Sequence, residues 1–255
     1  VALPRPAALP VSRSALLAAF PFVVHGVSRR VPGLGSADGN LGYSGRRNRV
    51  DAWRMRRAWA EAMGLNPDRI VTAAQVHGAD VRRVAAADAG HGALPETQLP
   101  PADALITDAV GPVLLSLHAD CLPILFVDPG GDRRRPAVGV AHAGWRGSVA
   151  GIAAATARAM AAAFASDPGE LRVWLAPAIG GCCYEVGEEV ARAWEATAGS
   201  EAAVALVPTQ ERWRFDLRRA NALLLARVGV RPERIEATAE CTRCAADHRV
   251  TGILR

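Results

Sequence analysis

Apolar and polar positions along the chain alternate between the helical period and short strand-like runs. Residues 54–63 carry apolar side chains at helical spacing and end at Gly64, with Pro67 just beyond, which predicts a helix. Further helices are expected at 149–164, 186–197 and 217–228. Strands are expected at 70–76, 79–84, 104–107, 113–127, 137–141, 173–176 and 235–237. This mixture predicts an α/β (α+β) fold with a largely buried mixed sheet.

The longest apolar run, residues 113–127, is interrupted by His118-Ala119-Asp120-Cys121 and contains Pro123. A run of this length is typical of a buried strand, and polar residues inside it are typical of a strand that breaks to present a site. Because proline has no N–H to donate, we expect strand pairing to end or bulge at Pro123.

Length and composition predict one continuous domain. The chain has 255 residues, of which 50% are hydrophobic, so it can bury a large core. We expect an N-terminal extension at 1–22 and a single domain at 23–255. Residues 1–22 mix proline and arginine and show no signal-peptide pattern, and no window approaches the roughly 18 apolar residues of a membrane span. No membrane partner is expected.

The charge balance is basic, with a formal net charge of +5, and all 30 basic residues are arginines. These arginines are scattered and aromatic residues make up only 5%, so no stacking surface for nucleic acid is predicted. Arginine does suit phosphate-bearing or acidic small substrates. Five cysteines, an odd number in a long chain, argue against a disulfide scaffold and for a cytoplasmic location. The sequence makes no prediction of oligomeric state.

Three fragments place a potential metal ligand beside small residues at a strand end. They contribute His77 (QVHG), Cys121 (HADC) and His142 (AHAG), a donor set that suits one mononuclear Zn²⁺ or Cu²⁺ ion with an open coordination position. The ligands lie 44 and 21 residues apart, so spacing alone leaves open the alternative of three unrelated buried residues.

The fragments QVHGADV, ADALITD, HADCLPILFVD, VGVAHAGWRG and APAIGGCCYEVGEEV closely resemble the laccase-domain family, also called YfiH-like polyphenol oxidoreductases or purine nucleoside phosphorylases. The resemblance runs from about His25 to Thr242. It implies a single domain of mixed β-sheets flanked by helices, the YfiH-like cysteine-hydrolase-type fold. It also implies His77, Cys121 and His142 as ligands of zinc or copper, and activity on purine nucleosides.

Four further residues are candidates for the site, each with a structural alternative. Asp120 is a candidate general acid or base, or a turn-capping carboxylate. Arg146 is a candidate phosphate contact, or part of a structural salt bridge. Trp145 is a candidate for stacking on a base, or is simply packed. Asn40 matches a family position near the pocket, or serves a turn. His118 is expected to face away from Cys121 and to pack or support a ligand from behind.

The expected activity is metal-dependent phosphorolysis of adenosine, inosine or methylthioadenosine to the free base and a (methylthio)ribose 1-phosphate. The resemblance also implies adenosine deamination, and weak polyphenol oxidation is compatible with one copper ion. A four-copper laccase is excluded, because it needs on the order of ten histidines and the chain has six. The small-molecule partners are then a nucleoside and phosphate.

Two alternatives from other classes remain open. One is a cysteine hydrolase or amidase that acts on peptidoglycan-type fragments, with Cys121 as nucleophile and His142 as base. The other is a non-enzymatic metal-binding module, which the three obvious ligands disfavour because structural zinc normally has four.

The remaining cysteines are expected to be structural. Cys182 and Cys183 lie in a glycine-rich turn without a nearby histidine in the sequence. Cys241 and Cys244 form a CxxC motif without a second pair, which is too weak a signal to predict a zinc knuckle.

Overall fold

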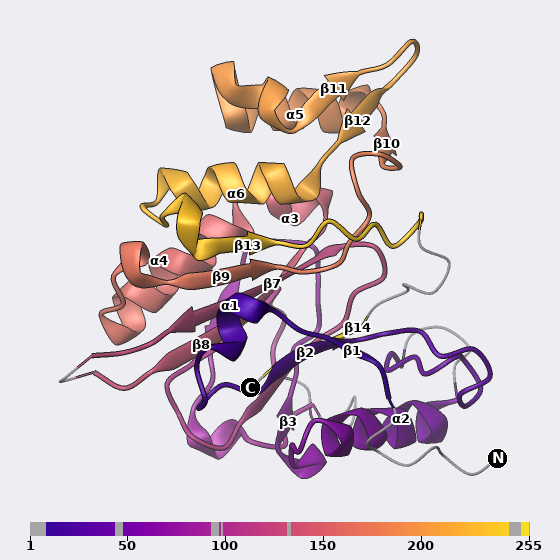
Figure 1. Cartoon of the computed structure of the whole chain (residues 1–255), viewed down its shortest axis with the longest axis vertical. Helices are drawn as coiled ribbons and strands as arrows, with labels where there is room; N and C mark the ends of the chain where they lie inside the picture. Colours follow the sequence, from indigo (N-terminus) through magenta and orange to yellow (C-terminus); the bar gives the residue numbers. More distant parts are fainter. Residues whose placement is uncertain are drawn as a thin grey trace.

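Two β-sheets stack face to face at the centre of the computed structural model, and helices cover the outer face of each sheet (Figure 1). The structure describes residues 9–43, 48–92, 97, 99–131, 134–244 and 251–254. The layers run from α2 (Arg49–Ala62) through a five-stranded and a six-stranded sheet to the helices of the C-terminal half. The predicted fold class of mixed sheets flanked by helices is confirmed.

The six-stranded sheet carries the middle of the fold, in the order β13, β9, β7, β8, β5, β4. Its strands are β4 (Val81–Arg83), β5 (Ala104–Thr107), β7 (Leu122–Asp128), β8 (Ala137–Ala143), β9 (Arg172–Leu175) and β13 (Ile235–Ala237). All seven residues of β7 are buried, because the other sheet packs on one face and helices pack on the other. This double coverage explains the continuous apolar run in the sequence.

The expectation that strand pairing ends at Pro123 is wrong on one side of β7. Pro123 lies opposite His142 in the antiparallel register with β8, and the pairing continues for one further residue pair. On the other side the β9 register begins at Ile124, and the Pro123 carbonyl accepts a hydrogen bond from the Ala176 N–H at 3.0 Å. The N and O of one strand residue point to the same side, so the missing donor falls at the end of the β9 ladder, where it costs little.

The five-stranded sheet has the order β1, β2, β14, β6, β3. Its strands are β1 (Val11–Ser12), β2 (His25–Ser28), β3 (Ile70–Val71), β6 (Val113–Ser116) and β14 (Thr251–Leu254). Val27 and Leu114 on its inner face belong to one core cluster with Leu125 and Trp174 of the six-stranded sheet. The strand predicted at 70–76 ends at Val71, because the chain leaves the sheet there for a long loop.

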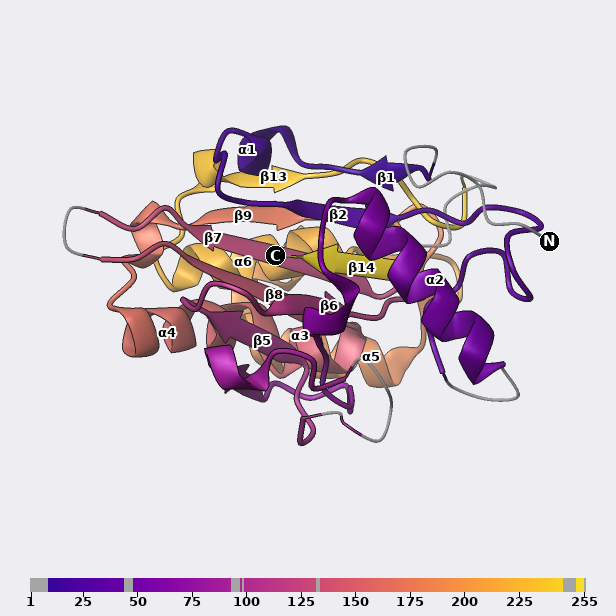
Figure 2. The ribbon, with the colours of Figure 1, turned by 90° about the horizontal axis from the view of Figure 1, so that it is seen from below.

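Helix α2 covers the outer face of the five-stranded sheet (Figure 2). Its buried side chains, which include Met55 and Trp59, form a core cluster with Ile70 and Val113 of the sheet. The helix begins five residues before the predicted start, because the Asn48 side chain accepts a hydrogen bond from the Asp51 N–H and caps the first turn. No helix in the described ranges is long and apolar enough to cross a membrane.

The described part of the expected N-terminal extension, residues 9–22, packs onto the rest of the chain. β1 pairs with β2, and α1 (Ala15–Ala18) buries Leu17 completely between the two sheets. The Ser14 hydroxyl donates a hydrogen bond to Glu236 of β13 at 2.8 Å. These contacts join the start of the described chain to both sheets, while the division at residue 22 stays a prediction.

The outer face of the six-stranded sheet is covered by α3 (Trp145–Val149), α4 (Ile152–Phe164) and α6 (Leu217–Arg227). A small sheet of β10 (Glu185–Val186), β12 (Trp213–Phe215) and β11 (Leu206–Pro208) extends beyond them together with α5 (Glu188–Ala198) (Figure 1). The helix predicted at 149–164 is α4, which begins three residues later, and the short helix α3 before it was not predicted. Gly151 has a φ of +81°, a left-handed conformation that a continuous helix does not contain.

Candidate metal and substrate site

Three potential metal ligands meet at one end of the six-stranded sheet. Cys121 directly precedes β7, His142 is the last residue but one of β8, and the antiparallel register places them side by side. His77 comes from the loop between β3 and β4. One ligand atom of each residue lies within 4.8 Å of the others. Strand pairing therefore gathers side chains that are far apart in the sequence.

A buried carboxylate, Asp103, holds two of these ligands in place. It directly precedes β5, and its Oδ1 lies 3.0 Å from His142 Nδ1 and accepts a hydrogen bond from the His77 N–H at 3.0 Å. Its Oδ2 accepts hydrogen bonds from the N–H groups of Gly78 at 2.7 Å and Val76 at 3.2 Å. One side chain thus fixes both the loop that carries His77 and the ring of His142.

The hydrogen bond between Asp103 and His142 stabilises the charged form of both side chains. Burial alone lowers the pKa of His142, but hydrogen bonds to Asp103 and Cys121 raise it to about 9. Burial alone raises the pKa of Asp103, but the hydrogen bonds from His142 and from the backbone N–H groups of Gly78 and His77 lower it below its ordinary value. With Nδ1 held by Asp103, Nε2 is the His142 nitrogen available to a metal.

Two residues of the site have left-handed backbones. His77 has a φ of +62° and Asp120 a φ of +73°. Such conformations are uncommon for residues other than glycine, and they cluster where a side chain must be aimed at a site. At His77 the three N–H groups bound by Asp103 stabilise the turn.

His118 packs against His142, which agrees with the expectation of a packed histidine, but its side chain also interacts with the Cys121 backbone and does not face away from it. Its side chain is buried, and the two ring centroids are 5.2 Å apart. Burial and the neighbouring His142 lower the pKa of His118 well below its ordinary value, so this ring is neutral. It packs against the ring of His142 and is not one of the three clustered ligands.

A cavity of about 330 Å³ lies beside the ligands. It is lined by His77, Ala119, Asp120, Cys121, Gly144, Trp145, Arg146, Ile179, Tyr184 and Leu217. A volume of this order suits a small molecule, and the lining combines apolar walls with a few polar groups, as small-molecule sites do. Burial and the nearby Cys121 raise the pKa of Tyr184 to about 12, so its hydroxyl stays protonated at neutral pH.

Arg146 is the cation of this cavity. Its side chain is exposed, and its guanidinium lies over the ring of Trp145, 4.3 Å from the centroid. Across the described ranges no carboxylate forms an ion pair with Arg146. Burial and His142 lower the pKa of His77, and the positive charge of Arg146 adds to this effect. At Tyr184 the same charge opposes a part of the rise in pKa that burial causes. The alternative of a structural salt bridge therefore has no partner in the described part of the chain.

Asp120 and Asn40, the other two candidates, lie in different surroundings. Asp120 lines the cavity, and its Oδ1 accepts a hydrogen bond from the Thr242 hydroxyl at 2.5 Å. The Asn40 Oδ1 accepts a hydrogen bond from the Gly42 N–H at 2.7 Å, as a turn asparagine does. Asn40 is not among the described residues that line the cavity.

A family model described as multi-copper polyphenol oxidoreductase laccase matches residues 24–251. The chain belongs to this laccase-domain family. The resemblance drawn from the sequence fragments is thereby confirmed.

Relatives within the laccase-domain family carry phosphorylase names. Purine nucleoside phosphorylase YlmD of Geobacillus stearothermophilus is 36% identical over 207 residues, which are 80% of this chain and 74% of that protein. Purine nucleoside phosphorylase LACC1 of Mus musculus is 31% identical over 231 residues, which are 87% of this chain but 50% of the mouse protein. The crystal structure of YlmD from Geobacillus stearothermophilus matches with a TM-score of 0.85 at 32% identity and covers 92% of both chains.

The donor set of this laccase-domain chain fits one metal ion. Two imidazoles and a thiol suit zinc or copper, and three protein ligands leave a position open toward a substrate. His77 and Cys121 line the cavity, so a metal ion that they bound would be accessible to a molecule in it. The hydrogen bond between His142 and Asp103 is the support that metal-binding histidines commonly have.

Several residues at the site were not singled out from the sequence. Asp103 lies within the fragment ADALITD. The sequence feature that could have identified it is its position as a carboxylate directly before the apolar run of β5, which is fully buried. Ile179 and Tyr184 lie within the fragment APAIGGCCYEVGEEV, and Leu217 begins α6, but these three cavity residues have no chemical signal of their own in the sequence.

Gly144 brings the backbone close to the ligands, which leads to a prediction. A Cβ at this position would lie 3.0 Å from Cys121 Sγ and 3.6 Å from His77 Cδ2. Gly144→Ala is expected to displace the sulfur and to weaken Zn²⁺ affinity roughly ten- to a hundredfold, the range for disturbed support of a ligand. Titration against a competing chelator measures this change.

The matched control for this prediction is Gly187→Ala. Gly187 precedes α5 with φ −82° and ψ 177°, close to the −72° and 178° of Gly144 before α3, and a Cβ there meets nothing within 4 Å. It is expected to bind Zn²⁺ like the wild type. Equal Zn²⁺ affinity in the two variants would show that the backbone at position 144 does not need glycine to pass close to Cys121.

Proposed function

We propose that the chain is a metal-dependent purine nucleoside phosphorylase. The observation that carries the proposal is the placement of Arg146, a cation without an ion pair among the described residues, on the cavity that His77 and Cys121 also line. A nucleoside and a phosphate need an apolar wall, a cation and polar groups around the sugar. The phosphorylase names of the relatives agree with this chemistry.

Each cavity residue then has a separate task. Phosphate binds Arg146, whose planar guanidinium suits paired phosphate oxygens. Because the guanidinium covers one face of the Trp145 ring, we assign to Trp145 the support of Arg146 and not the stacking of a base on that face. The purine packs on the apolar wall of Ile179 and Leu217.

In the reaction, a phosphate oxygen bonds to ribose C1′ while the bond from C1′ to the purine nitrogen breaks. The electron pair of the broken bond goes to the purine, which takes up a proton. Tyr184 stays protonated at neutral pH and is our candidate to donate a hydrogen bond to the departing base. Asp120, oriented by Thr242, is our candidate to accept a hydrogen bond from a ribose hydroxyl.

His77, Cys121 and His142 would hold the metal. Zinc or copper bound there supplies a Lewis acid at the end of the cavity, which stabilises negative charge on a substrate or activates water. Asp103 keeps the His142 ring in one orientation, so the site does not have to reorganise when substrate binds. Adenosine deamination, in which water replaces the C6 amine and ammonia leaves, is proposed as a second activity of the same cavity.

A second candidate function rests on Cys121 and His142. Their side chains belong to one cluster whose ligand atoms lie within 4.8 Å of one another, and a cysteine beside a histidine base is the arrangement of a thiol nucleophile. In that case the Cys121 sulfur attacks an amide carbon of a peptidoglycan-type fragment while His142 takes the thiol proton. The C–N bond then breaks, and the amine leaves with that proton. The protein would then act without metal, and a covalent acyl group would form on Cys121.

The deciding assay supplies the purified protein with inosine or adenosine, with and without inorganic phosphate. Phosphorolysis is expected to release free base and ribose 1-phosphate only when phosphate is present. Deamination is expected to convert adenosine to inosine without phosphate. Absence of both reactions in metal-loaded protein would overturn the proposal and favour the cysteine hydrolase.

Arg146→Ala is expected to raise the KM for phosphate roughly ten- to a hundredfold, which corresponds to the loss of a charge-assisted hydrogen bond. The KM for the nucleoside is expected to change much less. Arg158→Ala serves as the control, because Arg158 is an exposed arginine of α4 outside the cavity lining. An unchanged KM for phosphate in Arg146→Ala would remove Arg146 from the phosphate site.

A further inference from the structure

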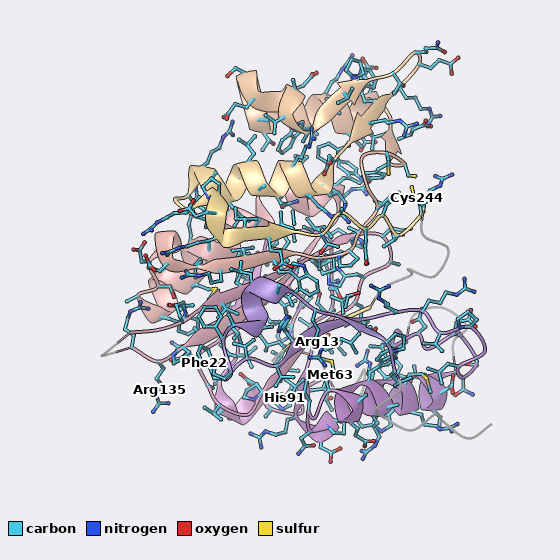
Figure 3. The ribbon with its side chains drawn as sticks, viewed as in Figure 1. Arg13, Phe22, Met63, His91, Arg135 and Cys244 are labelled. Carbon is cyan, nitrogen blue, oxygen red and sulfur yellow. The ribbon has the colours of Figure 1, made fainter. Side chains whose placement is uncertain are left out.

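Four cysteine thiols gather at a second place in the fold, away from Cys121. Cys182 and Cys183 lie in the turn before β10, and Cys241 and Cys244 lie in the segment after β13. All four sulfur atoms lie within 4.8 Å of one another. Figure 3 shows Cys244 where the segment after β13 comes near the chain that leads to β10. The CxxC motif therefore has the second pair that the sequence did not reveal.

Backbone contacts hold the two segments together at this cluster. Ala178 pairs with Cys241 in a parallel bridge, and the Thr242 N–H donates to the Ala178 carbonyl at 3.1 Å. The buried Arg218 side chain donates to the carbonyls of both Ala178 and Glu240. The thiols therefore meet on a framework of hydrogen bonds between main-chain groups.

Three sulfur separations in the cluster lie at or below the edge length of a tetrahedral zinc site. Zinc bound to four thiolates has Zn–S bonds of about 2.3 Å, which gives S···S edges of about 3.8 Å. Cys182 and Cys183 have a sulfur separation of 3.8 Å, and Cys244 lies 3.5 Å and 3.1 Å from them. Gly180 leaves room for this arrangement, because a Cβ there would lie 3.0 Å from Cys182 Sγ and 3.2 Å from Cys241 Cβ.

A backbone donor also faces the cluster. The Gly180 N–H donates a hydrogen bond to Cys241 Sγ at 3.2 Å. Metal-bound side chains commonly have such supporting hydrogen bonds, which orient the ligand atom.

We propose that Cys182, Cys183, Cys241 and Cys244 form a second metal site, a closed structural site for Zn²⁺. Four thiolates are the ligand set of structural zinc and leave no position for a substrate. The proposal does not depend on the phosphorylase proposal, because it uses none of the same ligands.

The proposed zinc would brace one wall of the cavity. The segment between β9 and β10 carries Ile179 and Tyr184, and the segment after β13 carries Thr242. Both reach Asp120: its carbonyl accepts from the Ile179 N–H at 2.9 Å, and its carboxylate accepts from the Thr242 hydroxyl. A metal that joins the two segments fixes these contacts without entering the cavity.

The test uses the full chain with Cys121→Ala, which retains only the four cluster cysteines. This protein is expected to contain about one zinc per chain by elemental analysis. After exchange with Co²⁺ it is expected to show the strong absorption of cobalt bound by four thiolates. Adding Cys244→Ser is expected to remove both signals. Adding Cys244→His, which keeps a fourth ligand, is expected to retain zinc and to shift the cobalt bands.

Circular dichroism of each variant distinguishes a folded protein that no longer binds metal from a protein that does not fold. If Cys121→Ala does not fold, Cys244→Ser in the otherwise unchanged chain is expected to lose one of about two bound metal ions. A folded Cys121→Ala protein without zinc and without cobalt–thiolate absorption would overturn the proposal. A disulfide among the four cysteines in freshly purified protein, found by mass spectrometry without reductant, would overturn it in favour of a redox pair.

Discussion

Replacing Cys121 by alanine is expected to remove one metal ion per chain and to lower the rate of phosphorolysis about a thousandfold. The sulfur is the one anionic ligand of its site when ionised, and two imidazoles alone hold zinc or copper much less tightly. Loss of a Lewis acid costs several kcal/mol of transition-state stabilisation, and roughly 4 kcal/mol corresponds to the thousandfold change. Elemental analysis and a ribose 1-phosphate assay on the same preparation measure both effects.

Thermal unfolding of Cys121→Ala provides the control for this result. The side chain is only partly buried, so the variant is expected to fold. If the four-cysteine cluster binds zinc as proposed, that ion remains and the metal content falls by one and not to zero. Full activity in a variant that has lost its metal would contradict the metal-dependent proposal. A metal-free wild type that forms a covalent acyl group on Cys121 would favour the hydrolase.

Asp103→Asn is expected to lower both the free energy of unfolding and the metal affinity. Four donors face the Asp103 carboxylate, two at each oxygen: His77 N–H and His142 Nδ1 at Oδ1, and the Gly78 and Val76 N–H groups at Oδ2. In either orientation of its amide group, an asparagine at position 103 turns its NH₂ toward two hydrogen-bond donors, which it cannot satisfy. The expected loss is about 3 kcal/mol of stability for the buried unmatched groups. Metal affinity is expected to fall roughly ten- to a hundredfold.

Asp108→Asn is the matched control, because Asp103 and Asp108 flank the same strand, β5. Asp108 forms a partly exposed ion pair with Arg83 at 3.1 Å, and its loss is expected to cost less than about 1 kcal/mol. Denaturant unfolding and chelator competition on both variants make the comparison. Equal behaviour of the two variants would show that Asp103 does not organise the ligands.

Elements with a strong local signal were predictable from the sequence. β5 and β13 were predicted to the residue, and α6 begins at the predicted Leu217. The strands of two to four residues at β1, β2, β10, β11, β12 and β14 were missed. None of these missed strands lies in a long apolar run, and they form because a partner strand supplies their hydrogen bonds.

The sequence by itself determined the mixed α/β class, the family and the residue types of the candidate metal site. Each of these depends on local pattern or on motifs such as QVHG and HAGWRG. Only the tertiary structure decided which residues share a site. It placed Asp103 behind His142, left Asn40 outside the cavity lining and brought Cys182 and Cys183 to Cys241 and Cys244. The physical reason is that these neighbours are set by strand register and by hydrogen bonds between distant segments, which leave no periodic trace along the chain.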